Sequence, residues 1–548
     1  MATDSATEEL RLRQRQELER RRSESAPLRP RLQTPEPPAA ARPVPDERCF
    51  PVERIELAVP EAITRQHPEF AATVGPDGRL AFLRPILNAR KGECLGVGAI
   101  NELVRALTAR LLENGSTTTR ILIPPQNLAD GILRLDLVPG YIEAIEVDGV
   151  EGPFALNPLP LAEGDLLDLN ALEQGLEQFE LPGQQVRFDL EPGREPGASL
   201  LRIHAQRQRP VRLRLQLEDS GSRATGRWRL GGELELDGPF AHHGRLHLGW
   251  NGSPQRAGDR RADGLHLDYR LPLGWWQLRI DLDRGRYRQS VAGINQSFIS
   301  SGDNRRAALT LSRTLARDRR HKLDADLSLA ARESRSFIEG VEIKSQRRLQ
   351  TDLELALRQT VRLKATDLSW RLAHRRGLHL FGAREDFPGT TGADPTFFYR
   401  LFTFDLGLAR GFALGETQAL AARIDLHAQY SSTPLYTQEQ LAIGGRSSVR
   451  GFDGEQILSA EHGVIVRSEL EWRHGSDGPR PFAALDWGRV SGPSARQLAG
   501  RELVGSALGL RWSWRGLELE SFAGWPLVKP RGLQSEQPAW MLRVEWKR

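Results

Sequence analysis

The chain lacks any long uninterrupted apolar segment. Its 548 residues contain no run of about 18 apolar residues, the length that a helix needs to cross a bilayer, so a helical membrane protein is excluded. The mean hydropathy of −0.46 is, on average, that of a soluble protein. A transmembrane β-barrel gives the same kind of average, because polar and apolar residues alternate along its strands.

An excess of charge of one sign is also missing. The 76 basic and 71 acidic residues give a net charge of +5 and alternate along the chain, which argues against a nucleic-acid partner. The sequence contains no GxxxxGK[ST], HExxH or GxSxG motif, so it offers no nucleotide site, zinc-protease site or nucleophile elbow. We therefore expect no cofactor, no metal and no enzymatic activity.

Cysteine is scarce. Cys49 and Cys94 cannot form a metal cluster or a CxxC redox site. They could close one disulfide, which would stabilise the fold by roughly 4 kcal/mol and requires an oxidising compartment, or remain two buried thiols. The first residues show no apolar signal segment, so we expect either a cytoplasmic chain or a trimmed start.

The first 48 residues have an unusual composition. Residues 8–24 are rich in helix formers but have almost no apolar face, which is typical of a solvated helix or of one in a polar environment. Seven prolines between 27 and 45 favour an extended tether. We expect a helix within 1–26 and a linker over 27–48, although the composition also suits a disordered tail.

Residues 49–139 and 140–207 read as two α/β units with the same order of elements. Each begins with an alternating strand, continues with an amphipathic helix and ends with further strands. In the first unit the helix ends at Asn114-Gly115, a helix-stop signal.

From residue 208 to 548 the pattern changes to a period of two. Apolar residues alternate with Arg, Glu, Asp and His in roughly sixteen segments. A soluble β-sandwich is the alternative, but sixteen strands greatly exceed a sandwich. The even number and the charged second face favour a transmembrane barrel.

One long interval in this region, 441–456, is too rich in glycine and polar residues to be a spanning strand. Long ordered loops are usually functional. A loop arginine, Arg450, that folds into a barrel would require a charged partner. Asp486 is a carboxylate at a strand position where the alternation would otherwise place a neutral residue. Taken separately, the two residues also fit a surface loop and a solvated carboxylate.

These two segments carry a resemblance to a known family. Val449, Arg450, Gly451 and Phe452, together with Phe482, Asp486 and Gly488 in a Phe-x-x-x-Asp-x-Gly motif, resemble the signature pair of two-partner secretion transporters. These transporters are the TpsB group, which includes haemolysin activators, filamentous-haemagglutinin transporters and contact-dependent-inhibition transporters. The resemblance implies that the loop bearing Arg450 reaches into the barrel and that Arg450 pairs with Asp486 on its wall.

The amino-terminal half agrees with this resemblance. Cys49-Phe50-Pro51-Val52 and Gly92-x-Cys94-Leu95-Gly96 resemble the first POTRA domain of the family, and Phe188-x-Leu190-x-Pro192-Gly193 resembles the second. The resemblance implies a plug helix at 1–26, a periplasmic linker at 27–48, POTRA domains at 49–139 and 140–207, and a sixteen-stranded barrel at 208–548. It also implies a Cys49–Cys94 disulfide.

The function implied by the resemblance is protein export. The chain would be an outer-membrane pore that recognises an unfolded, β-helical exoprotein through periplasmic POTRA domains and translocates it without ATP. Outer-membrane lipid and lipopolysaccharide would surround the barrel, with no nucleic acid or nucleotide involved. The alternatives are an assembly factor or insertase of the same superfamily, a plugged passive porin and a soluble carbohydrate-binding or hydrolytic β protein.

Overall fold

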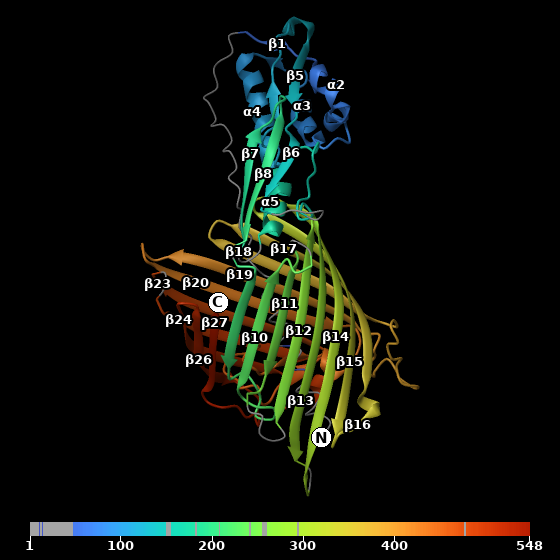
Figure 1. Cartoon of the computed structure of the whole chain (residues 1–548), viewed down its shortest axis with the longest axis vertical. Coiled ribbons are helices and arrows are strands. Elements are labelled where there is room, and N and C mark those ends of the chain that lie inside the picture. The colour runs from blue at the N-terminus through green and yellow to red at the C-terminus, as the bar shows by residue number, and fades with distance from the viewer. Residues whose placement is uncertain are drawn as a thin grey trace. The chain divides into compact units, whose positions relative to one another are not determined.

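A computed structural model gives the arrangement of the chain (Figure 1). It describes Leu10, Gln14 and the following ranges: 48–149, 155–180, 184–207, 209–240, 243–254, 260–292, 295–475 and 478–548. The chain divides into two compact units, one containing 30–208 with 272–275 and the other containing 1–29, 209–271 and 276–548. Most of the helix expected at 1–26, and the linker except Arg48, lie outside the described residues.

The first α/β domain is built around a three-stranded sheet. Its strands are β2 (Arg54–Ala58), β4 (Arg120–Leu122) and β5 (Ile132–Val138), with β5 in the centre, parallel to β2 and antiparallel to β4. The remaining elements are β1 (Phe50–Pro51), α2 (Glu61–Gln66), η1 (Pro68–Val74), η2 (Ala81–Leu83), α3 (Arg84–Asn88), β3 (Cys94–Leu95), α4 (Val97–Glu113) and η3 (Leu128–Asp130).

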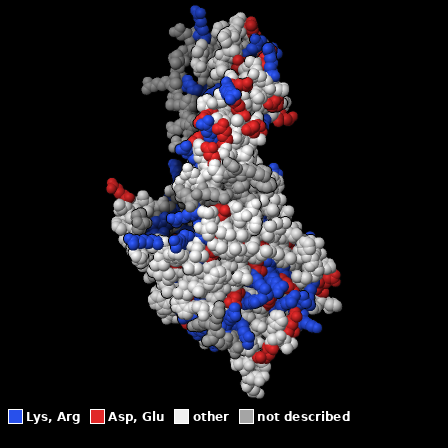
Figure 2. Space-filling view, in the orientation of Figure 1, with Lys and Arg blue, Asp and Glu red and all other residues white. Residues whose placement is uncertain are grey.

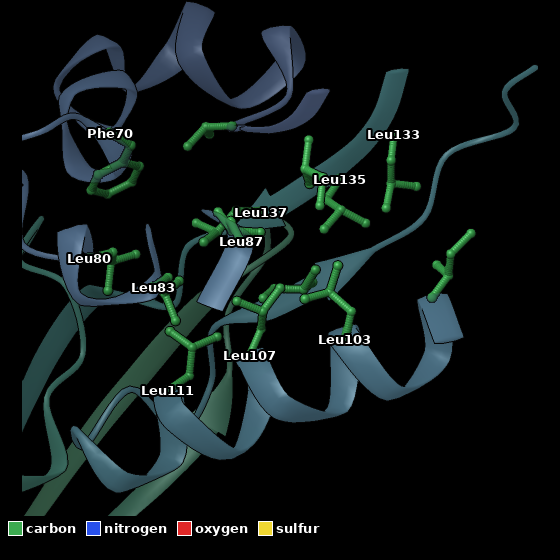
Figure 3. Packing of buried hydrophobic residues seen from close by; sticks show 14 of the residues in the cluster. Phe70, Leu80, Leu83, Leu87, Leu103, Leu107, Leu111, Leu133, Leu135 and Leu137 are labelled. Carbon is green, nitrogen blue, oxygen red and sulfur yellow. The ribbon is translucent and has the colours of Figure 1, made fainter. Parts of the chain in front are cut away.

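Helix α4 and strand β5 supply most of the core of this domain (Figure 3). Leucines spaced four apart on α4 pack against leucines spaced two apart on β5, because these spacings place side chains on one face of a helix and of a strand. They are Leu103, Leu107, Leu111, Leu133, Leu135 and Leu137, all at most 1% exposed. The helix ends where the sequence predicts, with Asn114 as its C-cap residue and Gly115 at φ +86°.

The structure joins Cys49 to Cys94 in the same domain. Their Cα atoms are 5.3 Å apart, within the range that a disulfide requires. The bond links the residue before β1 to β3, which pairs with β1.

The second α/β domain repeats the first. Strand β6 (Tyr141–Asp148) is parallel to β8 (Ala198–Arg207), and β7 (Gln184–Pro192) lies antiparallel on the other side of β8. Helix α5 (Leu169–Phe179) begins at Asp168, whose side chain accepts a hydrogen bond from the Asn170 backbone N–H.

Sixteen antiparallel strands form a closed barrel, which confirms the predicted fold class. They are β9 (Val211–Glu218), β10 (Arg229–Asp237), β11 (Arg245–Gly252), β12 (Arg261–Leu273), β13 (Trp276–Ala292), β14 (Ser297–Arg317), β15 (His321–Ile338), β17 (Arg348–Leu363), β18 (Thr366–Leu378), β19 (Arg400–Ala413), β20 (Gln418–Ser431), β23 (His462–His474), β24 (Arg480–Ser491), β25 (Glu502–Trp514), β26 (Leu517–Val528) and β27 (Ala539–Lys547). The short strand β16 (Val341–Glu342) pairs with the end of β15, and η4 (Lys344–Gln346) follows it.

The two faces of the barrel have opposite polarity. On β13, Ile280 and Leu282 are 36% and 45% exposed, whereas the neighbouring Arg279 and Asp281 are 9% and 1% exposed. Apolar side chains therefore point outward and charged side chains point inward, as in a membrane barrel. Among the described helices, none is long and apolar enough to cross a bilayer.

The loop between β20 and β23, residues 432–461, is called the inward loop here. It contains η5 (Thr437–Glu439) and a small hairpin made of β21 (Leu441–Ile443) and β22 (Leu458–Ala460). Outside this loop, η6 (Ser494–Gln497) follows β24. Apolar residues of the inward loop pack on inner-wall side chains of β23, β24 and β25, namely Ile465, Val490 and Leu503.

Candidate functional site

The tip of the inward loop is bonded to the barrel wall through one arginine. The Arg450 Nε donates to Asp486 Oδ2 and its Nη2 donates to Asp486 Oδ1, each at 2.8 Å. The backbone N–H of Arg450 also donates to Asp486 Oδ2 at 2.8 Å. Arg450 is 3% exposed and Asp486 is fully buried. The structure thus brings together the two residues that the sequence singled out.

A wider network of charges supports this pair. Arg450 Nη1 also donates to Glu469 Oε2 at 2.5 Å, and Glu469 in turn accepts from Arg511 Nη2 at 3.1 Å. Arg511 further pairs with Glu471 at 2.8 Å. The sequence reasoning missed Glu469 and Arg511, because nearly every inward position of these strands is charged and alternation alone does not select partners.

Phe482 is connected to the same network. Its ring lies 4.3 Å from the Arg511 guanidinium carbon, a cation–π contact. Phe482 therefore contacts Arg511, which binds Glu469, and Glu469 in turn binds Arg450.

Three glycines of the barrel wall allow the inward loop to approach it closely: Gly488 of the motif, and Gly505 and Gly524 outside it. A Cβ at Gly488 would lie 2.9 Å from Val449 Cγ2, and one at Gly524 would lie 2.6 Å from the Gly451 nitrogen. A Cβ at Gly505 would collide with the Arg450 carbonyl oxygen. Glycine within a strand commonly marks such a close approach, and this was the signal available for the two missed glycines, Gly505 and Gly524.

Gly451 and Phe452 complete the tip of the loop. Gly451 has φ +109°, a conformation that side chains rarely adopt. Phe452 is fully buried in an apolar cluster that includes Leu503 of the wall and Leu533 of the connection between β26 and β27.

A second ionic contact fixes the start of the inward loop. Glu439 lies 3.3 Å from Arg332 Nη1 and 3.9 Å from Arg375 Nη1, and its side chain is 2% exposed. Its backbone carbonyl accepts from Gln429 Nε2 at 2.9 Å. Nothing in the sequence pattern distinguished Glu439 from other loop carboxylates.

A third contact joins the loop to the seam where the first and last strands meet. Arg446 Nη1 lies 3.2 Å from Asp219 Oδ1, which also accepts from the Leu542 backbone N–H at 2.9 Å. Strand β27 pairs with β9 over only five positions, whereas β13 pairs with β14 over seventeen. The loop therefore reaches the wall where the strand pairing is much shorter than that between β13 and β14.

Gln14, near the amino terminus, contacts the inward loop. The Gln14 side chain donates to the Ala442 carbonyl at 2.7 Å and accepts from the Ala442 backbone N–H at 3.2 Å. Leu10, one turn earlier, is 2% exposed. The side-chain amide of Gln14 thus bonds to both backbone polar groups of Ala442, as the backbone of a strand beside β21 would.

Comparison with known proteins identifies the family. Residues 197–512 match the family described as haemolysin secretion/activation protein ShlB/FhaC/HecB, and residues 77–140 match the ShlB-type POTRA domain. The chain belongs to this family. It is an outer-membrane transporter of two-partner secretion with periplasmic POTRA domains, as the sequence predicts, and this assignment fits better than an insertase or a porin.

Individual relatives agree with the family assignment. The chain is 32% identical over 493 residues to the outer membrane transporter CdiB-2 of Burkholderia pseudomallei, covering 88% of the chain and 84% of that relative. It is 26% identical to the haemolysin transporter protein ShlB of Serratia marcescens, covering 79% of the chain and 78% of that protein. The solved structure of CdiB from Escherichia coli, at 25% identity, superposes with a TM-score of 0.82 and covers 98% of each chain.

Proposed function

We propose that this transporter exports an unfolded, β-helical exoprotein through its barrel, and that the inward loop, held by Arg450 and Asp486, organises the transport path. The buried Arg450–Asp486 pair carries this proposal, because a loop fixed to the wall by three hydrogen bonds has a defined position in the pore. Export would be driven by folding of the exoprotein outside the cell, with no nucleotide and no catalytic step.

The proposed entry point is an exposed sheet edge in the POTRA domains. Strand β4 is an edge of the first sheet, and Leu122 and Ile123 at its end are 53% and 44% exposed. Strand β7 is an edge of the second sheet, with Leu190 40% exposed. An extended segment of the exoprotein can add to such an edge by main-chain hydrogen bonds.

The proposed resting state has the helix within residues 1–26 in the pore, tethered by a linker at 27–48. Its support is the Gln14–Ala442 contact, which attaches this helix to the inward loop. We further propose POTRA domains at 49–139 and 140–207 and a barrel at 208–548 that includes the loop segment 441–456.

Co-expression with the product of the neighbouring gene tests the function. The neighbouring protein should appear in the medium only when this chain is present. Its appearance without the chain, or its retention with an inserted barrel, would contradict the export role.

The entry point has a separate test. Leu122→Lys should reduce export, because a charge on an edge strand opposes pairing with another strand. Val97→Lys is the matched control, since Val97 is 73% exposed in the same domain but lies on a helix. Equal export by the two variants would exclude this edge.

A further inference from the structure

A group of arginines lies on the outer face of the barrel at one end of β13, β14 and β15. Its members, called the arginine patch here, are Arg284, Arg286, Arg305, Arg335 and Arg347, together with the carboxylates Asp303 and Glu333. Figure 2 shows charged side chains gathered on the barrel over these strands.

Strand alternation places the patch outside the barrel. On β13, Arg284 and Arg286 continue the outward series of Ile280 and Leu282, and on β14 Arg305 continues the outward series of Leu309 and Leu311. Arg284 lies opposite Arg305 in the pairing of β13 with β14. The outward residues of both strands therefore change from apolar to charged at the same level of the barrel.

The patch begins where the apolar band ends. On β13 the outward apolar series runs from Trp276 to Leu282, and Arg284 follows. The eight steps from Trp276 to Arg284 span about 27 Å along the strand. At the tilt of about 35–45° that strands of such barrels adopt, this length corresponds to a height of about 19–22 Å, slightly less than the lipid-facing band of about 25 Å. Trp276, which the Arg313 guanidinium carbon contacts at 4.9 Å, marks the other boundary.

The end that carries the patch is the outer one. Several connections at this end are long, including 339–347 and the inward loop, although 293–296 between β13 and β14 has four residues. The connections at the other end that adjoin β14, β15 and β17, 318–320 and 364–365, have three and two residues. Long loops face outward and short turns face the periplasm in bacterial outer-membrane barrels. The patch therefore lies at the level of the head groups of the outer leaflet.

Positive charge exceeds negative charge within the patch. Asp303 forms ion pairs with Arg284 at 2.7 Å and with both Arg286 and Arg305 at 3.4 Å. Glu333 forms ion pairs with Arg335 at 2.6 Å and with Arg347 at 2.9 Å. Five guanidinium groups share these two carboxylates, and Glu342 of β16 adds one more negative charge near Arg335, which leaves a surplus of two positive charges.

A single carboxylate, Asp303, offsets the repulsion between two arginines that face each other. Arg284 and Arg305 are directly opposite each other on adjacent strands, and like charges in that position are destabilising. Arg286 and Arg305 remain 55% and 51% exposed beside Asp303, so their outer sides are accessible to a ligand.

We propose that the arginine patch binds the phosphate groups of a phosphorylated glycolipid in the outer leaflet, with the acyl chains lying on the apolar rows below. Guanidinium groups match phosphate oxygens with paired hydrogen bonds, and the patch faces lipid rather than the pore. The apolar rows that follow without a gap, through Leu282 and Leu309, suit acyl chains attached to the same molecule.

Native mass spectrometry of the full-length protein in detergent, titrated with bisphosphorylated lipid A, tests this site. The triple variant R284Q/R286Q/R305Q should bind lipid A about 100-fold more weakly, because each arginine near an anionic lipid contributes about 1 kcal/mol and 1.4 kcal/mol is tenfold. R313Q is the matched control, since Arg313 is exposed on the same face of β14 at its other end.

A second variant tests the site without removing an arginine. D303N raises the surplus of positive charge and should tighten lipid A binding. Equal binding of lipid A by the wild type, the triple variant and D303N would overturn the proposal. Equal affinity for dephosphorylated lipid A or phosphatidylglycerol would overturn the glycolipid assignment, and competition by inorganic phosphate at matched concentration would reveal a free-anion site instead.

Discussion

Asp486 accepts three hydrogen bonds from a single residue, Arg450, through the backbone N–H, Nε and Nη2. The side-chain bonds pair the charges, while the backbone bond fixes the position of the loop chain itself. The loop tip is thereby located by its main chain as well as by its side chain.

Replacing Arg450 should abolish export while leaving barrel insertion intact. Arg450→Ala removes the partner of a fully buried carboxylate, and breaking a buried pair in this way costs about 3–5 kcal/mol. Asp486→Ala should have the same effect. Secreted exoprotein reports export, and heat-modifiable migration on a gel reports folding of the barrel.

The matched control for this experiment is Glu518→Gln. Glu518 pairs with Lys547 at 2.9 Å, but the two side chains are 47% and 40% exposed, so little is lost. Normal export from Arg450→Ala would refute the role of the pair.

The polarity of the barrel could be predicted because the alternation of apolar and charged residues is visible within each strand, whichever residues of the next strand lie opposite. Leu282 beside Asp281 already indicates which face meets lipid. The pairing of Arg450 with Asp486 came from family resemblance, since two residues 36 positions apart carry no local signal of contact. Glu469 could not be predicted, because its partners depend on how the loop folds back onto β23.

The disulfide illustrates a different limit. The spacing of Cys49 and Cys94 left paired and free thiols equally open, because loop length changes closure entropy only slowly. The pairing of β1 with β3 brings them together, and that contact between two-residue strands leaves no periodic pattern in the sequence.

Glu439→Gln should reduce export less severely than Arg450→Ala. Arg332 keeps Asp352 at 3.4 Å and Arg375 keeps Glu354 at 2.6 Å, so no guanidinium is left alone. The expected cost is about 1–3 kcal/mol, that of a disrupted hydrogen-bonded charge.

Protease accessibility of the inward loop on intact cells measures this effect. It should rise in Glu439→Gln and remain unchanged in Glu416→Gln, a control in an exposed short turn. Unchanged accessibility in both variants would remove Glu439 as an anchor of the loop.

Gln14→Ala should increase channel conductance in planar bilayers. The substitution removes two hydrogen bonds to Ala442, each contributing about 0.5–1.5 kcal/mol, so the helix should leave the pore more often. Deletion of residues 1–26 provides the fully open reference. Conductance that stays at the wild-type level in the deletion would argue against a plug.

Removing the disulfide should destabilise the first α/β domain by roughly 4 kcal/mol, the loop-closure value for a loop of this length. Hydrogen exchange of the full-length C49S/C94S variant should accelerate in α4 and β5, which form the core beside the bond. Exchange in the barrel should stay unchanged, and an equal acceleration in both would indicate a general folding defect.

The ring of Tyr141 packs against that of Phe70 in the first α/β domain, with centroids 5.2 Å apart, and this contact between the two α/β domains should weaken in alkaline solution. Burial, followed by its hydrogen bond to Glu195 and the nearby carboxylates, raises the pKa of Tyr141 to about 12, from 10 in an unfolded chain. The folded state therefore retains the phenol proton more strongly, and this contribution to stability is complete below pH 10 and is lost as the pH rises toward 12. Tyr141→Phe removes the titration, so hydrogen exchange around Tyr141 should depend less on pH above 10, after correction for the intrinsic exchange rate. The same pH dependence in both proteins would show that another group causes it.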